Sequence, residues 1–191
     1  MTVQQELASW MSPPALNVSP VPEIGSEAPS SSALPLPNPN NKPTIVTFLR
    51  HCGCPFAEKT FKDLCAFADK HPEVNFTAVS HSDQASTDHW LESVGGKDSV
   101  PVIVDHERAT YARWGLGISS AWHILSPWAL YNVYKLGTEE GIWNRPTETG
   151  SRWQEAGSAA IDKDGIVRWV HKSKTADERP DFSEALNALG V

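Results

Sequence analysis

Residues 44–56 have the sequence Thr-Ile-Val-Thr-Phe-Leu-Arg-His-Cys-Gly-Cys-Pro-Phe. The run from 44 to 49 is β-branched and apolar with no polar alternation, which is typical of a central strand buried on both faces. Pro55 suits the first position of a helix, where a backbone N–H would have no partner anyway. The stretch therefore predicts a buried strand, a short loop carrying two cysteines, and a helix over about 56–70.

The expected helix has one apolar and one polar face. Glu58 and Lys62 form a favourable i,i+4 pair, which we expect on the solvent side. The apolar residues follow helical spacing, so they share one buried face and Cys65 is expected to serve in packing. They are Phe61, Leu64, Cys65 and Ala68.

The rest of the chain alternates short strands and helices. This order predicts an α/β thioredoxin-like fold, with a central mixed sheet flanked by helices. An Asp-Gly turn between two apolar runs predicts a terminal hairpin. The expected elements are strands at 74–80 and 102–104, helices at 86–94 and 108–114, the hairpin at 159–170 and a helix at 182–189.

Residues 1–43 differ in composition from the remainder of the chain. They hold nine of the fifteen prolines, a density that excludes helix interiors and central strands. We expect a Pro-rich N-terminal arm with at most a short helix, extended or disordered over 1–20. The thioredoxin-like domain is expected to occupy 44–191.

The charge and the first residues restrict the partners and the location. A net charge of −7 gives no electrostatic reason to bind nucleic acid or an anionic membrane. The first residues lack the apolar run of a secretory signal, and no stretch suits a membrane span. Three cysteines do not make a secreted disulfide framework. A cytoplasmic protein is expected.

Residues 118–136 are rich in aromatic side chains, in a chain with eight tryptophans. We expect two helices broken at Pro127, an insertion relative to a minimal thioredoxin fold. Such a segment could cover the sheet, form a homodimer interface or line an apolar substrate pocket.

Four parts of the chain carry a resemblance to a known family: Pro22–Pro29, Phe48–Phe56, Pro101–Asp105 with Tyr111–Gly115, and Gly157–Gly165 with Trp169–His171. They resemble stretches of the peroxiredoxin-like (AhpC/TSA-2) group of the thioredoxin-fold superfamily. The similarity runs from about residue 22 to residue 190. It implies a thioredoxin-like fold and an antioxidant thiol oxidoreductase.

Cys54 is the candidate nucleophile. Cysteine reacts as the thiolate, and a helix that begins at Pro55 offers unpaired N–H groups and a positive dipole end to that anion. Arg50 and His51 could add positive charge nearby. By resemblance, Cys54 takes the position of the peroxidatic cysteine. The alternative is a buried, inert cysteine.

Two neighbours of Cys54 have candidate roles that the sequence leaves open. Cys52 could resolve a sulfenic acid at Cys54, or it could simply end the strand and face the core. His51 could act as a general acid or base, or could hold the backbone. Zinc binding by these residues is disfavoured, because the spacing is too short and a fourth ligand is lacking.

The chain departs from its relatives at several positions. Ala57 stands where many relatives have a second cysteine, and His51 stands where typical peroxiredoxins have a threonine. Ala156 stands where they have an arginine. Arg152 is the nearest basic residue and could replace that arginine.

The favoured function is a thiol-dependent peroxidase that needs no cofactor or metal. Thioredoxin or glutathione would be the reductant, and a small apolar peroxide would be the substrate. One alternative is an enzyme of the same fold recruited to a small-molecule pathway with non-peroxidase chemistry. Another is a non-catalytic binding protein.

Overall fold

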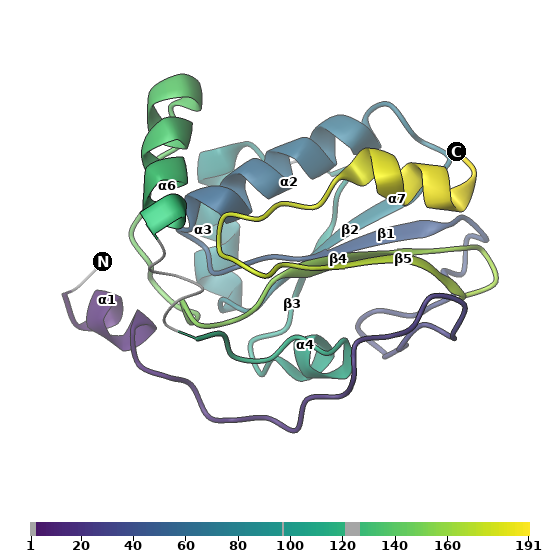
Figure 1. Ribbon diagram of the computed structural model, residues 1–191, viewed down its shortest axis with the longest axis horizontal. Coiled ribbons are helices and arrows are strands. Elements are labelled where there is room, and N and C mark those ends of the chain that lie inside the picture. The colour runs from purple at the N-terminus through teal and green to yellow at the C-terminus, as the bar shows by residue number, and fades with distance from the viewer. Residues whose placement is uncertain (1–2, 97, 121–126) are drawn as a thin grey trace.

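A five-stranded mixed sheet forms the centre of the computed structural model, which describes residues 3–96, 98–120 and 127–191. The strand order is β3-β2-β1-β4-β5 (Figure 1). β1 (Thr44–Phe48) runs parallel to β2 (Asn75–Ser80), which runs parallel to β3 (Val102–Val104). On its other side, β1 is antiparallel to β4 (Gly157–Ile161), which forms the predicted hairpin with β5 (Val167–Lys172). The predicted mixed α/β sheet is confirmed.

Two apolar clusters lie on opposite faces of this sheet. One face packs against α2 (Pro55–Ala68), α3 (Gln84–Val94) and α7 (Phe182–Leu189). The other packs against α4 (Ala109–Arg113) and the N-terminal arm. Neighbouring β1 residues alternate between the clusters, with Ile45 in the first and Val46 in the second. Every β1 residue is therefore buried, as the unbroken apolar run predicts.

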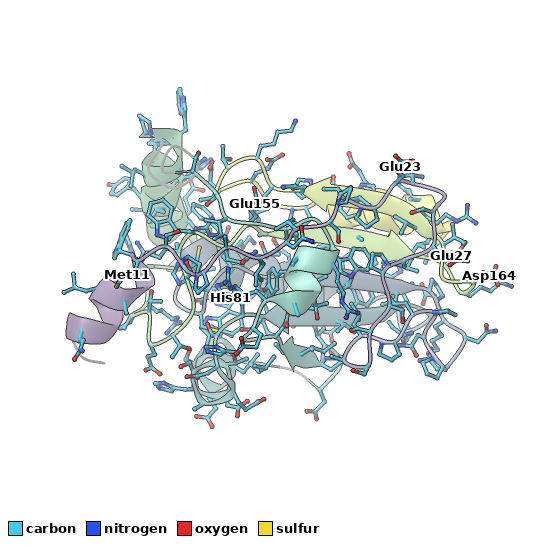
Figure 2. All side chains as sticks on the ribbon, turned by 90° about the horizontal axis from the view of Figure 1, so that it is seen from below. Met11, Glu23, Glu27, His81, Glu155 and Asp164 are labelled. Atoms are coloured by element: carbon cyan, nitrogen blue, oxygen red, sulfur yellow. The ribbon has the colours of Figure 1, made fainter. Side chains whose placement is uncertain are left out.

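The N-terminal arm begins with α1 (Val3–Ser9) and then crosses one face of the domain as extended chain. Figure 2 shows it passing from Met11 at one end of the molecule to Glu23 and Glu27 at the other. Glu27 pairs with Ile166 in an isolated bridge, and Leu34 and Leu36 belong to the second apolar cluster. The arm thus contributes to the core, and a division at residue 43 stays a prediction.

α6 (Pro127–Glu140) carries the aromatic segment and is longer than expected. It stands beside the start of α2 at one end of the molecule (Figure 1), and Trp128, Tyr131 and Tyr134 are exposed. The interpretation as a sheet cover is therefore wrong for α6. A second helix was expected before Pro127. At its start, Ile118 instead pairs with Gln154 in an isolated bridge, and residues 121–126 lie outside the described residues.

Within the described ranges, none of the helices combines the length and the apolar character needed to cross a bilayer.

Candidate active site

Cys54 lies immediately before the first residue of α2. Its backbone is extended, and its carbonyl oxygen accepts the Glu58 N–H at 3.1 Å, so it caps the helix through its backbone. Its side chain makes no capping hydrogen bond. The first-turn N–H groups and the positive end of the helix dipole therefore lie next to this sulfur. The residue is buried in the apolar cluster that also contains Phe56, Leu136 and Ile142.

Gly53 allows a distant segment to close over the two cysteines. Its φ is +114°, and a Cβ atom there would lie 2.9 Å from the carbonyl oxygens of both Arg145 and Pro146. The Arg145 N–H also donates to the Gly53 carbonyl at 3.0 Å. Only glycine fits this close backbone approach. Residues 145–146 thus form part of the site, although they lie far from it in the sequence.

The Cys52 thiol faces the ends of β2 and α3. Its Sγ lies 3.6 Å from Ser80 Oγ and 3.9 Å from Thr87 Oγ1, and its N–H donates to Ser82 Oγ at 3.2 Å. Burial raises the pKa of the Cys52 thiol, although the nearby hydroxyl groups oppose this. Cys52 is therefore a neutral thiol at pH 7. No disulfide joins it to Cys54 in this structure.

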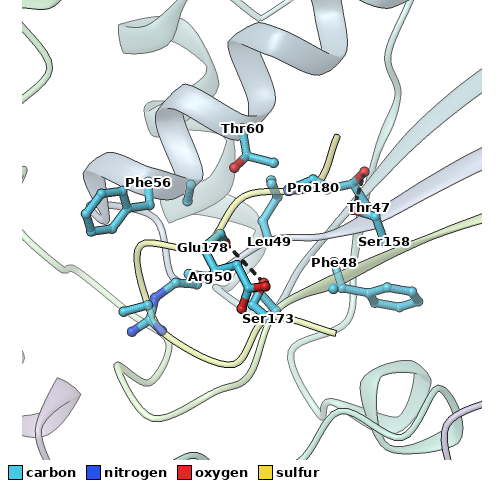
Figure 3. Close-up of a pocket in the computed structure, with 14 residues that line it drawn as sticks. Thr47, Phe48, Leu49, Arg50, Phe56, Thr60, Ser158, Ser173, Glu178 and Pro180 are labelled. Atoms are coloured by element: carbon cyan, nitrogen blue, oxygen red, sulfur yellow. Dashed lines mark hydrogen bonds between the residues drawn. The ribbon is translucent and has the colours of Figure 1, made fainter. Parts of the chain in front are cut away.

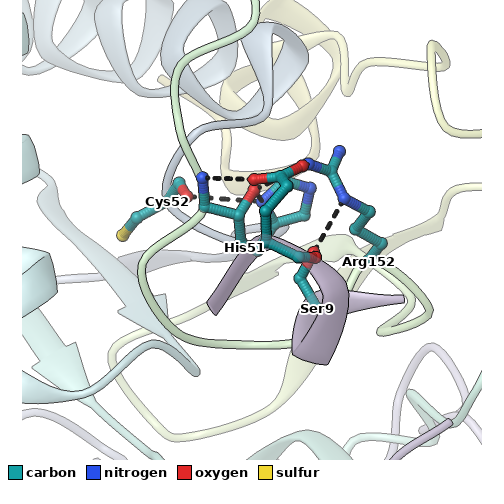
Figure 4. Close-up of polar contacts among 6 residues, drawn as sticks. Ser9, His51, Cys52 and Arg152 are labelled. Atoms are coloured by element: carbon teal, nitrogen blue, oxygen red, sulfur yellow. Dashed lines mark hydrogen bonds and ion pairs between the residues drawn. The ribbon is translucent and has the colours of Figure 1, made fainter. Parts of the chain in front are cut away.

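His51 belongs to a buried polar cluster (Figure 4). Its Nδ1 lies 3.3 Å from both Thr147 Oγ1 and the Cys52 carbonyl oxygen. Burial lowers the pKa of His51 well below its usual value, and the charges of Arg50 and Arg152 lower it further. The imidazole is consequently neutral at pH 7. Its low pKa makes it a weak general base, while its contacts suit a residue that holds the loop.

Arg152 is held by the N-terminal helix. Its Nε donates to Ser9 Oγ at 2.9 Å, and its Nη2 donates to Thr147 Oγ1 at 3.0 Å and pairs with Glu6. Its guanidinium group lies 4.8 Å from the centre of a Trp10 ring. Nε and Nη2 of Arg152 thus join α1 to the site, and these contacts give no support to Arg152 as the replacement for the missing arginine.

Arg50 offers free hydrogen-bond donors instead. Its Nη2 donates to the Arg152 carbonyl oxygen at 2.6 Å, whereas Nε and Nη1 have no acceptor among the described residues. It lines a cavity of about 20 Å³ together with Phe56 and Ala57 of α2 and with Ala156 (Figure 3). Such a volume holds about one water molecule. The buried guanidinium of Arg50 therefore shares a cavity with Ala156, the position at which the resemblance leads one to expect an arginine.

Glu58 is buried, which corrects the expectation that it faces solvent. The predicted pair with Lys62 forms, with 2.7 Å between Nζ and Oε1, but Arg145 Nε also donates to Oε2 at 2.8 Å. Burial would raise the pKa of Glu58, but Arg145 and Lys62 outweigh it and lower the pKa below its usual value. The ionised carboxylate thus ties the 145–146 segment to the first turn of α2.

His81 lies behind the polar cluster and belongs to the buried support of the site. Its Nε2 lies 3.1 Å from both the N–H and the carbonyl oxygen of Ser151. Burial lowers the pKa of His81 to about 4. The ring packs edge-on against Tyr111, with 5.4 Å between centroids.

The structure brings four of the five predicted site residues around one loop and places the fifth, Arg152, beside them. Sequence reasoning missed Glu6, Arg145 and Thr147, because the contacts they make span far more of the chain than any local motif. The only local signal for Arg145 and Thr147 was the Pro and Thr content of residues 137–151, which is typical of a loop. No three His, Cys, Asp or Glu side chains come together as a metal site in the described parts of the chain.

Solved structures of peroxiredoxins share this fold. A peroxiredoxin-like protein from Aquifex aeolicus is 17% identical, with a TM-score of 0.64 and coverage of 92% of this chain and 91% of that one. A cysteine-to-serine variant of peroxiredoxin 6 of Arenicola marina is 16% identical, with a TM-score of 0.58 and coverage of 88% and 72%. A yeast mitochondrial 1-Cys peroxiredoxin, resolved via glutathione and thioredoxin systems, is 16% identical, with a TM-score of 0.52 and coverage of 89% and 76%. These similarities confirm the thioredoxin-like fold.

The family comparison identifies the chain itself. No curated protein matches it closely enough to count as a relative. The family model described as AhpC/TSA antioxidant enzyme matches residues 61–175, more than half of the chain. That match begins within α2, after the two cysteines of the loop. It agrees with the resemblance of the sequence to peroxiredoxin-like proteins, and the chain therefore belongs to the AhpC/TSA antioxidant enzyme family.

Proposed function

We propose that this protein is a thiol oxidoreductase that reduces a peroxide through Cys54. The observation that carries the proposal is the position of Cys54 directly before Pro55, with its side chain outside the capping hydrogen bonds of α2. An anion at this place is stabilised by the unpaired N–H groups of the first turn and by the helix dipole. The thiolate is the form of cysteine that attacks an O–O bond.

The proposed reaction has two steps within the protein. The Cys54 thiolate attacks one peroxide oxygen, the O–O bond breaks, and the leaving oxygen takes a proton to become water or an alcohol. The resulting Cys54 sulfenic acid is then attacked by Cys52, which releases water and forms a Cys52–Cys54 disulfide. In this second step the Cys52 thiol, whose pKa is raised by burial, loses its proton as water leaves. An external thiol restores both cysteines.

Arg50 is the proposed source of positive charge in the first step. The leaving oxygen gains negative charge in the transition state, and fixed donors in a buried site stabilise such charge strongly. The Nε and Nη1 groups of Arg50 have no acceptor in the described part of the chain, and the residue shares a cavity with the first turn of α2. His51 would keep the loop in place through Thr147.

The surroundings of Cys54 support a small apolar peroxide as the substrate. The apolar cluster around its side chain favours an alkyl group over a charged one, and its 5% exposure favours a small molecule. We place the reaction in the cytoplasm, where thiol reductants keep cysteines reduced. The exposed aromatic face of α6 is the surface we propose for a homodimer.

The test compares the consumption of hydrogen peroxide and of a small alkyl hydroperoxide by three proteins, with glutathione or a thioredoxin system supplied. Cys54→Ser should consume peroxide no faster than buffer, because the nucleophile is gone. Cys65→Ala is the matched control, since Cys65 lies buried on the same helix away from its start. It should keep the wild-type rate. Equal rates for wild type and Cys54→Ser would refute the proposal.

A further inference from the structure

A cavity of about 140 Å³ opens beside Cys52, on the side of the loop that faces α3. Figure 4 shows the Cys52 sulfur pointing away from the cluster of His51 and Arg152. The cavity walls come from the cysteine loop, from α3 and from the segment that covers Gly53. They include Cys52, Ser86, His89, Trp90, Arg145 and Glu148.

Trp90 is one of the residues that line this cavity, and its indole N–H is an unsatisfied donor within the described ranges. The residue is 5% exposed, and its indole N–H has no acceptor among the residues that the structure describes. The ring is fixed by Phe61, with 5.3 Å between the centroids. A buried N–H without an acceptor costs about 1–3 kcal/mol, so such groups are rare unless a ligand or water completes them. The position therefore favours a ligand with an acceptor atom.

The other polar side chains that line the cavity include one positive and one negative group. Arg145 supplies a guanidinium group that is only partly used by Glu58. Glu148 supplies a carboxylate whose Oε1 lies 3.1 Å from His89 Nδ1. A ligand carboxylate would meet the Trp90 N–H and Arg145, and a ligand ammonium group would meet Glu148. The lining thus fits a small molecule with both groups.

We propose that this cavity binds a low-molecular-weight thiol that carries a carboxylate and an ammonium group, the class of cysteine and glutathione, and that this thiol reduces Cys52. The inference rests on the proposed function, because it needs a Cys52–Cys54 disulfide as its substrate. The cavity gives a thiol access to Cys52, whereas Cys54 is not part of its lining. A volume of this size admits the cysteinyl part of a small thiol and excludes the surface of a folded protein.

The chemistry is a pair of disulfide exchanges. The thiolate of the bound ligand attacks Cys52 Sγ, the bond to Cys54 breaks, and Cys54 leaves as a thiolate at the start of α2, where the helix stabilises it. A second ligand thiolate then attacks the ligand sulfur of the mixed disulfide. Cys52 leaves and takes a proton. Two thiols are oxidised to one disulfide, and the protein gains the two electrons.

The first experiment measures the reduction of peroxide-oxidised protein by glutathione, followed by mass spectrometry of the Cys52–Cys54 disulfide. Trp90→Phe keeps the ring and removes the donor, so the rate at low glutathione should fall by about tenfold, the loss of one hydrogen bond to a charged group. Trp114→Phe is the matched control. Its indole N–H also lacks an acceptor in the described ranges, but it lies in the apolar cluster on the other face of the sheet. It should react like wild type.

Two further probes test the charged groups of the ligand. Glu148→Gln should slow reduction by glutathione and leave reduction by 3-mercaptopropionate, which has no ammonium group, unchanged. Wild type should react more slowly with cysteamine, which has no carboxylate, than with cysteine. Equal glutathione rates for Trp90→Phe and wild type, or reduction only by thioredoxin, would overturn the inference.

A binding measurement separates this inference from the proposed function. S-methylglutathione cannot exchange disulfides, so its binding to the reduced protein, measured by calorimetry, does not depend on any peroxide reaction. Binding that weakens in Trp90→Phe but not in Trp114→Phe supports the cavity. No binding to wild type would refute it. Failure of peroxide to oxidise Cys54 would instead refute the proposed function and remove the disulfide that the reduction step needs, whereas the binding of S-methylglutathione would still test the cavity.

Discussion

Arg50 and Arg152 lie near the same loop, but their guanidinium groups meet different partners. Arg152 uses its donors on Glu6, Ser9 and Thr147, all within the protein. Arg50 Nη2 donates to a carbonyl oxygen, whereas its Nε and Nη1 have no acceptor in the described ranges, and the residue lines a cavity shared with the first turn of α2. Sequence proximity to the hairpin suggested Arg152 as the replacement for the missing arginine. Only the three-dimensional contacts distinguish the two.

Replacing each arginine tests this distinction. Arg50→Met should slow the formation of the Cys54 sulfenic acid by about 100-fold, the usual loss when one donor to a developing anion is removed. Arg152→Met should slow it much less, although it should destabilise the fold. The measurement is the rate of sulfenic acid trapping by mass spectrometry, with circular dichroism to verify folding. A larger effect on this rate from Arg152→Met than from Arg50→Met would contradict the assignment.

Among the secondary-structure elements, α1 makes the side-chain contacts that span the greatest separation in sequence. Its Glu6 pairs with Arg152 and accepts the Thr147 N–H at 3.1 Å, and Ser9 accepts from Arg152. A short helix of this length is not stable alone in water, so it owes its place to these contacts. In return, α1 holds the segment that covers the cysteine loop.

Glu6→Ala should therefore loosen both α1 and its partner segment. Removing one member of this half-buried ion pair should cost roughly 1–2 kcal/mol of local stability, between the values for exposed and buried pairs. Hydrogen exchange should speed up at the amides of 3–9 and 145–152 and stay unchanged in β1. Glu23→Ala, an exposed carboxylate in the same arm (Figure 2), is the control and should change neither region. Unchanged exchange in Glu6→Ala would show that α1 does not hold the segment.

The elements differ in how far the sequence could predict them. The strands, α2 and α7 were predictable from local periodicity and from Pro, Asp-Gly and Gly signals, which act within a few residues. The course of 141–156 and the burial of Glu58 were not, because each depends on a side chain that arrives from a distant part of the chain. The sequence left the surroundings of α6 open, because an aromatic pattern does not say whether a helix covers the sheet, lines a pocket or forms an interface.

The whole molecule should lose stability in mild acid because of its buried histidines. The usual pKa of 6.5 applies to the unfolded chain, whereas burial lowers that of His81 to about 4 and that of His51 well below its usual value. The unfolded state therefore binds protons below pH 6.5 that the folded state does not accept. The His81 contribution is fully present above pH 6.5 and is lost as the pH falls to about 4, which amounts to roughly 3 kcal/mol.

Urea unfolding at several pH values between 7.5 and 4.5 measures this loss. His81→Gln should show a shallower decline than wild type, because it removes one of the histidines whose pKa is lowered by burial. His106→Gln, at an exposed histidine, should decline as wild type does. A wild-type free energy of unfolding that stays constant across this range would contradict the prediction.

The bond between Glu6 and Thr147 joins residues 141 positions apart, so it closes a loop that contains β1, β2 and β3 of the sheet. Closing so long a loop is entropically costly until the intervening chain has become compact. In the time order of folding, α1 should consequently dock after the strands have paired. The cysteine loop would gain its cover last, and the protein would acquire a complete site only as its final contacts form.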